Sequence, residues 1–285
     1  EGLRDLLEPA AAKVTAAMGD VTLGSIPPEA GAMGGFLQQL SPLLLGAQVG
    51  AVLGFLGQHV LGQYDVAVPR SGTGKLLFVA TNVGRFERDW SLDPTDFRTF
   101  VALHEVTHRF EFARTWVGPR FRELLDDFMS TLQIDVEGIQ RRLSSLDASD
   151  PQAMQALLES DEGLFGSVLD DEQRIKLGRV QAFMAAAEGY GDHVAHGLGR
   201  SLLPTYTRIE EAMRRYREDE RSDPVFERLL GVEMKREQYA QGRAFCDAVV
   251  ELTDEATLGR MWADPEALPS LPEIEEPRLW LARTV

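Results

Sequence analysis

The sequence predicts a mainly α-helical fold with a small β-sheet or hairpin, formed by residues 1–285 as a single domain. Most of the chain consists of stretches whose apolar residues recur at helical spacing, separated by short breaks rich in Gly, Pro and Asp. Two short β-rich segments, 64–68 and 76–81, are bounded by Pro69 and Gly72 and predict the hairpin. Neither an internal repeat nor a domain linker is visible, which favours one domain.

An uncharged run lies near the start of the chain. Residues 30–64 contain no Asp, Glu, Lys or Arg, and 42–61 is almost wholly apolar. One interpretation is a transmembrane helix, which needs about 20 apolar residues, in a membrane-associated interaction protein. The other is a central helix buried on all sides. Gln58, His59 and the lack of flanking basic residues favour the buried helix, so we expect no membrane partner.

The charge and cysteine content narrow the class of protein. The formal net charge is −16 and the isoelectric point is about 4.8, without basic runs or aromatic-basic patches. Nucleic acid and anionic lipid surfaces are therefore not expected partners. Cys246 is the single cysteine, so no disulfide can form within the chain, and its apolar neighbours predict a buried structural thiol. We expect no signal peptide and a cytoplasmic location.

A helix that starts at Asp93 and Pro94 follows the second β-rich segment. Asp93 is suited to the N-cap and Pro94 to the first helical position. The apolar stripe predicts that this helix continues to about Trp116, where Gly118 and Pro119 end it.

The remainder of the chain also reads as helix. An amphipathic helix is predicted over 120–146 and a long helix from Asp170 to about Leu198. The tail at 265–277 is rich in Pro and acidic residues, and we expect it to lie extended on the surface. Further helices are predicted at 205–218, 224–230, 234–252 and 254–263.

The helix that begins at Pro94 carries a His-Glu-x-x-His motif. Residues four apart lie on one face of a helix, so His104 and His108 can both bind one metal ion through imidazole nitrogens. Glu105 can then take a proton from a water whose pKa the metal has lowered. The alternative is a hydrogen-bonded pair of core histidines. Two buried imidazoles without a partner would be costly, which favours the metal site.

A catalytic zinc site needs a third protein ligand and an open position for water. No third histidine follows His108 closely, which excludes the arrangement with three histidines in one extended motif. Glu188 lies among three alanines and two glycines on a packed helix face, where an acid needs a partner, and the alternative is a solvated acid. Asp192, one turn later, can accept a hydrogen bond from a ligand histidine. His193 and His196 are fallback ligands.

These motifs resemble the gluzincin branch of the zincin metallopeptidases. The resemblance implies that His104, His108 and Glu188 bind Zn²⁺ and that Glu105 is the general base. It also implies that Asp192 is the carboxylate behind a ligand histidine. The two motifs lie farther apart than in the thermolysin-like pattern, so a helical insertion is predicted at about 120–170.

A closer resemblance covers most of the chain. It is to a bacterial family of zincin-like presumed hydrolases, some of which are linked to the biosynthesis of a deazaflavin coenzyme. In that resemblance, segment 76–81 is the edge strand that aligns an extended peptide. The motifs that carry it are Val-Leu-Gly-Gln-Tyr-Asp at 60–65, Leu-Leu-Phe-Val-Ala-Thr-Asn at 76–82, Asp-Pro-x-Asp-Phe-Arg at 93–98 and Leu-His-Glu-Val-Thr-His-Arg at 103–109.

The main functional hypothesis is a zinc-dependent hydrolase, specifically a metallopeptidase that uses a metal-activated water. Its substrate would be a peptide or a small amide or ester. Tyr190, His193 and His196 are the candidate oxyanion donors. The alternative is a catalytically silent, metal-stabilised scaffold or interaction protein with the same fold.

Overall fold

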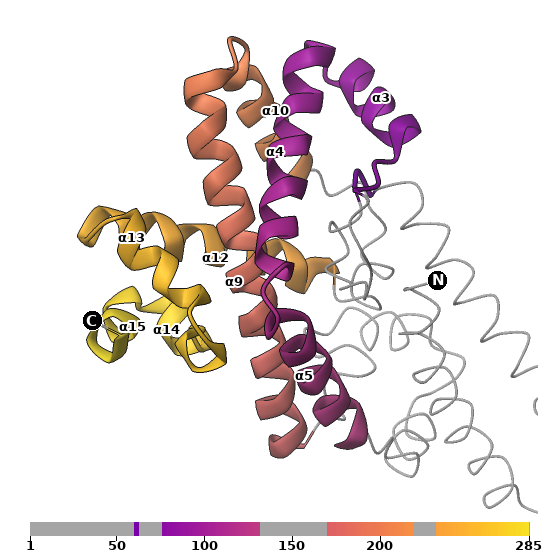
Figure 1. Cartoon of the computed structure of the whole chain (residues 1–285). Coiled ribbons are helices and arrows are strands. Elements are labelled where there is room, and N and C mark those ends of the chain that lie inside the picture. The colour runs from indigo at the N-terminus through magenta and orange to yellow at the C-terminus, as the bar shows by residue number, and fades with distance from the viewer. Residues whose placement is uncertain (1–59, 63–75, 132–169, 219–231, 285) are drawn as a thin grey trace, which may run out of the picture. The chain divides into compact units, whose positions relative to one another are not determined.

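The computed structural model describes residues 60–62, 76–131, 170–218 and 232–284 (Figure 1). The chain divides into two compact units, Glu1–Gln58 with Met129–Gln173 and His59–Phe128 with Arg174–Val285. The predicted site residues all lie in the second unit. The uncharged run is described only at 60–62, and its helix prediction and the strand at 64–68 fall outside the described residues. The single domain with an insertion at about 120–170 stays a prediction.

Helices form nearly all of the described chain, which confirms the mainly α fold. In Figure 1 the long helix α9 runs beside α4, with α3 and α10 near one end of this pair. The helices are α3 (Ala80–Asp89), α4 (Pro94–Phe112), α5 (Val117–Thr131), α9 (Asp171–Leu202), α10 (Tyr206–Glu218), α12 (Val232–Leu252), α13 (Glu255–Leu258), α14 (Leu271–Glu275) and α15 (Pro277–Thr284), with the 3₁₀ turns η2 (Gly259–Trp262) and η3 (Pro265–Ala267).

None of the helices in the described ranges has the length and apolar composition needed to span a bilayer.

Helix α4 begins where the sequence predicts. The Asp93 side chain accepts hydrogen bonds from the backbone N–H groups of Thr95 at 2.9 Å and Asp96 at 3.0 Å, with Pro94 as the first helical residue. This cap satisfies two of the four N–H groups that have no partner within the helix. The start of the helix that carries the His-Glu-x-x-His motif is therefore fixed locally by its own sequence.

The end of α4 differs from the prediction. The helix ends at Phe112 rather than near Trp116, and α5 begins at Val117. Gly118 and Pro119 therefore lie in the first turn of α5. A proline is tolerated there because the backbone N–H groups of a first turn have no acceptor within the helix. The pair marks the start of a helix, not the end of one.

The predicted strand at 76–81 is much shorter in the structure. Phe78 makes a single antiparallel bridge with Gly62, and α3 begins at Ala80. Within the described residues this bridge is the only β-pairing, so the described chain contains no hairpin. Residues 80–81 have β-rich neighbours but belong to an amphipathic helix that buries Val83 and Phe86.

The tail at 265–277 was predicted to be extended, and that prediction is wrong. It forms η3 and α14. Three of its four prolines occupy first-turn positions, where proline is tolerated or favoured: Pro265, Pro272 and Pro277. Asp264 caps η3 through the N–H of Ala267, and Ser270 forms a capping box with Glu273. Trp280 of α15 is fully buried, and its indole N–H donates to the carbonyl oxygen of Ala267 at 2.8 Å.

Two apolar clusters hold the second unit together. The first lies among α5, the first half of α9, α12 and the C-terminal helices, and it contains Phe183, Phe245 and Trp280. The second lies among α3, α4, the end of α9 and α10, and it contains Phe97, Phe100 and Ile209. Helices α4 and α9 each contribute to both regions, and between their two apolar stretches they carry buried polar residues: Glu105, His108, Glu111, Glu188 and Asp192.

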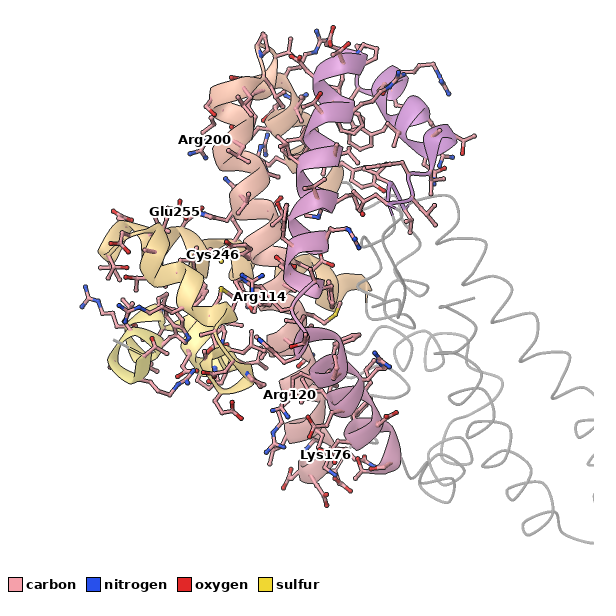
Figure 2. The ribbon with its side chains drawn as sticks, viewed as in Figure 1. Arg114, Arg120, Lys176, Arg200, Cys246 and Glu255 are labelled. Atoms are coloured by element: carbon pink, nitrogen blue, oxygen red, sulfur yellow. The ribbon has the colours of Figure 1, made fainter. Side chains whose placement is uncertain are left out.

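The thiol of Cys246 confirms one prediction about the core. It lies on α12 (Figure 2) and is buried in the first apolar cluster, and burial raises its pKa well above the ordinary value. The core is therefore packed around an inert thiol.

Helices α5 and α9 are also joined by an ion pair. Lys176 of α9, which is labelled in Figure 2, lies 3.0 Å from Asp127 of α5.

Glycines let α9 and α12 approach closely beside the polar stretch. A methyl group on Gly189 would overlap the backbone of Gly242, and one on Gly242 would overlap the carbonyl group of Ala185. Helix backbones can come this close only where neither has a side chain. The contact fixes the part of α9 that carries Glu188.

Candidate metal centre

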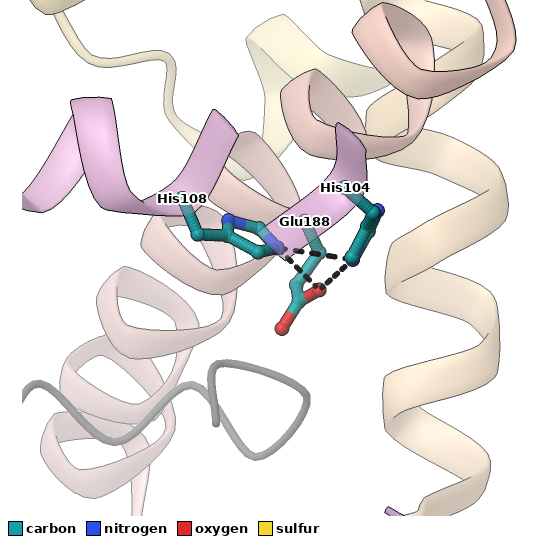
Figure 3. A group of neighbouring side chains, drawn as sticks. All are labelled: His104, His108 and Glu188. Carbon is teal, nitrogen blue, oxygen red and sulfur yellow. Dashed lines mark hydrogen bonds and ion pairs between the residues drawn. The ribbon is translucent and has the colours of Figure 1, made fainter. Parts of the chain in front are cut away.

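The two motif histidines meet on one face of α4. His104 and His108 are one helical turn apart, and their Nε2 atoms lie 3.1 Å from each other (Figure 3). The side chain of His108 is almost completely buried, whereas that of His104 is 16% exposed. The pair therefore presents two imidazole nitrogens toward one point near the surface.

Glu188 reaches the same point from α9. Its Oε2 atom lies 3.5 Å from Nε2 of His108 and 3.8 Å from Nε2 of His104 (Figure 3). The three ligand atoms all lie within 4.8 Å of one another, and the Glu188 side chain is 2% exposed. Helices far apart in sequence thus bring together the three side chains that the sequence predicts as ligands.

The spacing of these donors fits zinc. At bond lengths of about 2.0–2.1 Å, two ligands of a tetrahedral Zn²⁺ lie roughly 3.3 Å apart. The three separations of 3.1, 3.5 and 3.8 Å scatter around that value. A carboxylate and two imidazole nitrogens that face one another in a largely buried place need a proton or a metal ion between them. Two histidines and a glutamate are one of the ligand sets found in catalytic zinc sites.

Glu111 orients His108 from behind. Its Oε2 atom lies 2.8 Å from Nδ1 of His108, and both side chains are buried. Since a carboxylate accepts, Nδ1 carries the proton and donates it, and the lone pair on Nε2 faces His104 and Glu188. Burial lowers the pKa of His108, but the carboxylates of Glu111 and Glu188 outweigh burial and raise the pKa well above its ordinary value. A metal ion must therefore displace a proton to bind.

Gly191 makes the close approach of the two helices possible. A methyl group at this position would lie 2.7 Å from Cε1 of His108 and 3.4 Å from Cε1 of His104. Gly191 follows Glu188 by three residues, so it lies on the same face of α9. The imidazole rings pack directly on the helix backbone beside the ligand glutamate.

Glu105 is the predicted general base and follows His104 on α4. Its side chain is buried, with 1% of its surface exposed. The backbone of Gly62 lies against its carboxylate so closely that a methyl group on Gly62 would overlap it. The acid is therefore enclosed beside the histidine pair.

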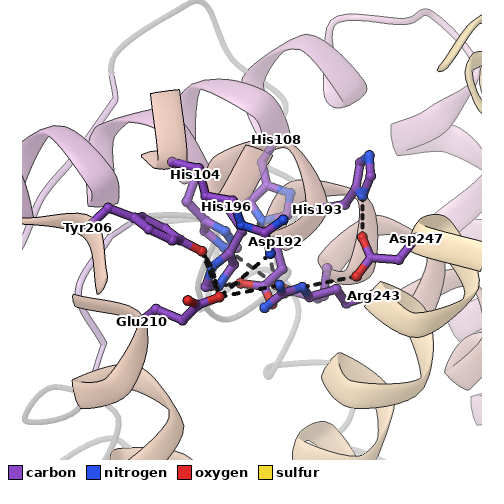
Figure 4. Close-up of polar contacts among 11 residues, drawn as sticks. His104, His108, Asp192, His193, His196, Tyr206, Glu210, Arg243 and Asp247 are labelled. Atoms are coloured by element: carbon purple, nitrogen blue, oxygen red, sulfur yellow. Dashed lines mark hydrogen bonds and ion pairs between the residues drawn. The ribbon is translucent and has the colours of Figure 1, made fainter. Parts of the chain in front are cut away.

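Asp192 lies one turn after Glu188, as predicted, and two of its contacts are with His196 and Arg243. Its Oδ1 atom is 3.1 Å from Nε2 of His196, and its Oδ2 atom is 3.8 Å from Arg243 (Figure 4). Glu111, which the sequence analysis did not assign, lies at hydrogen-bond distance from the motif histidine His108.

His196 faces a separate polar cluster. Its Nδ1 atom lies 2.5 Å from the Tyr206 hydroxyl, which donates to Glu210 at 2.8 Å (Figure 4). Burial, followed by the hydrogen bond to Glu210, raises the pKa of Tyr206 to about 12, so its hydroxyl stays protonated. Both ring nitrogens of His196 thus face groups of its own cluster, Asp192 and Tyr206.

His193 and Tyr190 also contact groups away from the ligand atoms. His193 lies 2.6 Å from Asp247 through Nδ1 and 3.2 Å from Glu255 through Nε2. The Tyr190 ring packs edge-on against Trp262, with centroids 5.6 Å apart. Burial, then the charge of Glu111, raises the pKa of Tyr190, so its hydroxyl is a proton donor at neutral pH.

Glu111 was missed in the sequence. The signal was present, because an acid three residues after His108 lies on the same side of the helix and can reach its ring. The sequence offered Asp192 for this position by analogy with the zincin pattern. Which of the two carboxylates meets the histidine depends on how α9 crosses α4, which spacing along one helix does not specify.

Together, the fold and the site define a helical protein with a buried His-His-Glu centre suited to a divalent metal ion, next to an enclosed glutamate. The chain belongs to the zincin-like metallopeptidase family, whose model matches residues 1–281. It is similar to a Chloroflexus aurantiacus protein whose crystal structure is described as that of a presumed hydrolase with a novel fold. The TM-score is 0.64 and the sequences are 37% identical, over 87% of this chain and 70% of that chain. A comparison with curated proteins finds no match.

Proposed function

We propose that this protein is a zinc-dependent hydrolase of the metallopeptidase type. The observation that carries the proposal is the convergence of His104, His108 and Glu188, whose ligand atoms all lie within 4.8 Å of one another. Membership of the zincin-like metallopeptidase family and the likeness to a presumed hydrolase support the same reaction class.

Each residue of the centre has a role that its environment supports. When bound, zinc supplies a Lewis acid that polarises a carbonyl group and lowers the pKa of a water molecule. Glu105 takes the proton from that water and delivers it to the leaving amine or alcohol. Glu111 holds the His108 ring through its Nδ1–H group, so that Nε2 keeps its lone pair toward the metal position.

The proposed substrate is a peptide or a small amide or ester. Tyr190 stays a candidate oxyanion donor from the sequence; its hydroxyl is protonated at neutral pH, but its ring packs against Trp262 and no described contact brings it to the ligand atoms. His193 and His196 are not assigned this role, since the ring nitrogens of both face other polar groups. The link of some family members to deazaflavin biosynthesis stays a prediction that no contact in the structure addresses.

The first test is the zinc content of the purified protein together with the Glu105→Gln variant. We expect about one zinc per chain in both proteins, because the three ligands are unchanged. Hydrolysis of a fluorogenic peptide library should fall by at least about 10²-fold in the variant, as expected when a general base is removed. Glu251→Gln, an exposed acid on α12, is the control. Full activity in Glu105→Gln would exclude this mechanism.

A second candidate function is a catalytically silent scaffold that the metal stabilises. The enclosure of Glu105, which is 1% exposed and covered by Gly62, favours it. Acetohydroxamate distinguishes the two functions, because it can bind only where the metal has an accessible position. A change in the visible spectrum of the cobalt-loaded protein on adding the hydroxamate would support the hydrolase. An unchanged spectrum would support the scaffold.

A further inference from the structure

The segment 60–62 is held by hydrogen bonds to the start of α3, and its last residue, Gly62, lies against the side chain of Glu105. The first residues of the Val-Leu-Gly-Gln-Tyr-Asp motif therefore have a defined place beside the metal centre, although none of them is a ligand. The contacts that hold the segment are the hydrogen bond from Asn82 Nδ2 to the carbonyl oxygen of Val60 at 2.8 Å, the hydrogen bond from the Val79 N–H to the carbonyl oxygen of Leu61 at 2.8 Å, and the antiparallel bridge between Gly62 and Phe78.

Gly62 is the residue of this segment that touches the acid. A methyl group built on it would overlap the carboxyl carbon and Oε1 of Glu105, and it would lie 2.7 Å from Cγ. The backbone of Gly62 lies outside the left-handed region, so an alanine would suit the backbone itself. The requirement for glycine here is space for the Glu105 carboxylate.

This contact restricts the direction in which Glu105 can point. A glutamate side chain has three rotatable bonds, and a general base must be held within a few tenths of an ångström of its working position. The Gly62 backbone packs against one side of the Glu105 carboxylate. The segment that carries Gly62 is in turn held by residues at the start of α3. Asn82, which anchors the segment, is 7% exposed, so the support is part of the packed structure rather than a surface loop.

We infer that Gly62 is a positioning residue for Glu105, and that the 60–62 segment seats the general base beside the His104–His108 pair. The inference rests on the proposed function, since Glu105 acts as a base only in the hydrolase. It assigns a role to the first three residues of the motif, Val60, Leu61 and Gly62, whose side chains cannot bind a metal ion or accept a proton.

The test compares Gly62→Ala with Gly84→Ala. Gly84 lies on nearby α3, and a methyl group there would meet only Arg88, at an ordinary 3.5 Å. Zinc or cobalt content should stay at about one per chain in both variants, because the ligands are untouched. Acetohydroxamate binding to the cobalt protein should weaken about tenfold or more in Gly62→Ala and in Glu105→Gln, as for a lost hydrogen bond to a charged group. Binding should be unchanged in Gly84→Ala.

A shorter acid provides the rescue. Glu105→Asp removes one methylene and leaves room for the added methyl group, so the Gly62→Ala/Glu105→Asp double variant should bind the hydroxamate better than Gly62→Ala alone. If Gly62→Ala folds poorly, thermal melting of Gly62→Ala in a Glu105→Ala background replaces the binding assay. The melting temperature lost through Gly62→Ala should largely return there, because the overlapping carboxylate is gone.

Three outcomes separate the inference from the function on which it rests. Weak hydroxamate binding in Gly62→Ala with rescue by Glu105→Asp supports the inference. Normal binding in Gly62→Ala, or an equal loss of melting temperature with and without Glu105, overturns it while the hydrolase proposal stands. A metal-loaded wild-type protein that binds no hydroxamate overturns the hydrolase proposal, and the role assigned to Gly62 falls with it.

Discussion

Two buried histidines on neighbouring helices have opposite surroundings. His108 on α4 and His196 on α9 are 1% and 2% exposed, and each has a carboxylate at 3.1 Å or less. The second nitrogen of His108 faces another imidazole and Glu188. The second nitrogen of His196 faces the Tyr206 hydroxyl at 2.5 Å.

The two rings differ in the group that faces the nitrogen pointing away from the nearest carboxylate. Around His196, Nδ1 lies within hydrogen-bond distance of the Tyr206 hydroxyl, which donates to Glu210, while Nε2 lies 3.1 Å from Asp192 without making a hydrogen bond (Figure 4). Around His108 the groups are all lone-pair donors that cannot bond to one another without a proton or a metal ion. Nε2 of His108 thus faces groups that carry lone pairs, whereas Nδ1 of His196 has a hydroxyl within hydrogen-bond distance, and this difference favours a metal ion at His108.

The largest expected effect is the loss of metal from His108→Ala. With one ligand removed, we expect zinc content to fall from about one per chain to near zero, because two remaining donors do not form a catalytic-type site. His196→Ala is the matched control, a buried histidine of the same size. It should keep its zinc even though it removes the histidine contacts of Asp192 and Tyr206 and lowers the melting temperature. Elemental mass spectrometry checks both proteins, and zinc loss from His196→Ala would contradict the comparison.

A smaller effect is expected from the carboxylates behind the two rings. Glu111→Gln should weaken zinc binding by about 10–100-fold, as found when the hydrogen-bond partner of a ligand histidine is lost. Asp192→Asn, which changes a carboxylate beside His196 in the same way, should leave zinc affinity within about twofold of wild type, because His196 is not a proposed ligand. Competition with a chromophoric chelator measures both affinities. A larger loss in Asp192→Asn than in Glu111→Gln would assign the supporting role to Asp192.

The start of α4 and the three donor residues of the centre could be predicted from the sequence because the signals are local. Asp93 and Pro94 specify the start of α4, and four-residue spacing puts His104 and His108 on one face. Glu188 was identifiable because an acid among alanines and glycines on a packed face needs a partner. The structure brings these three side chains together as the spacing indicated.

The remaining features depend on how separate segments meet. Asp192 has the spacing of the zincin pattern, but His196 lies one turn further along the same helix and faces the same carboxylate. The contact of Gly62 with Glu105 joins two segments more than forty residues apart, and no periodicity reports it. The tail was misjudged for a different reason. Its prolines suggest an extended chain until Asp264 and Ser270 are read as helix caps.

The smallest effect concerns a third histidine, His193, which is less buried than His108 and His196 and contacts two acidic residues. His193 on α9 keeps 12% of its side-chain exposure and pairs with Asp247 of α12, which is half exposed. The hydrogen bond to Asp247 raises the pKa of His193, while burial opposes it and Glu255 adds to it. Burial raises the pKa of Asp247, but His193 and Arg243 outweigh burial and lower it.

The sign of the pH dependence follows from these two directions. A raised folded pKa for His193 stabilises the fold below its unfolded pKa of about 6.5, and the contribution is lost as the pH rises through the folded value. A lowered folded pKa for Asp247 stabilises the fold above about 3.9, and that contribution is lost as the pH falls. Asp247→Asn should therefore reduce the free energy of unfolding near pH 6, by less than about 1 kcal/mol because the pair is partly solvated. The loss should shrink near pH 9. Urea unfolding of zinc-loaded wild type, Asp247→Asn and the exposed control Glu251→Gln at both pH values measures it. An equal loss at pH 6 and pH 9 would show that His193 carries no charge in the pair.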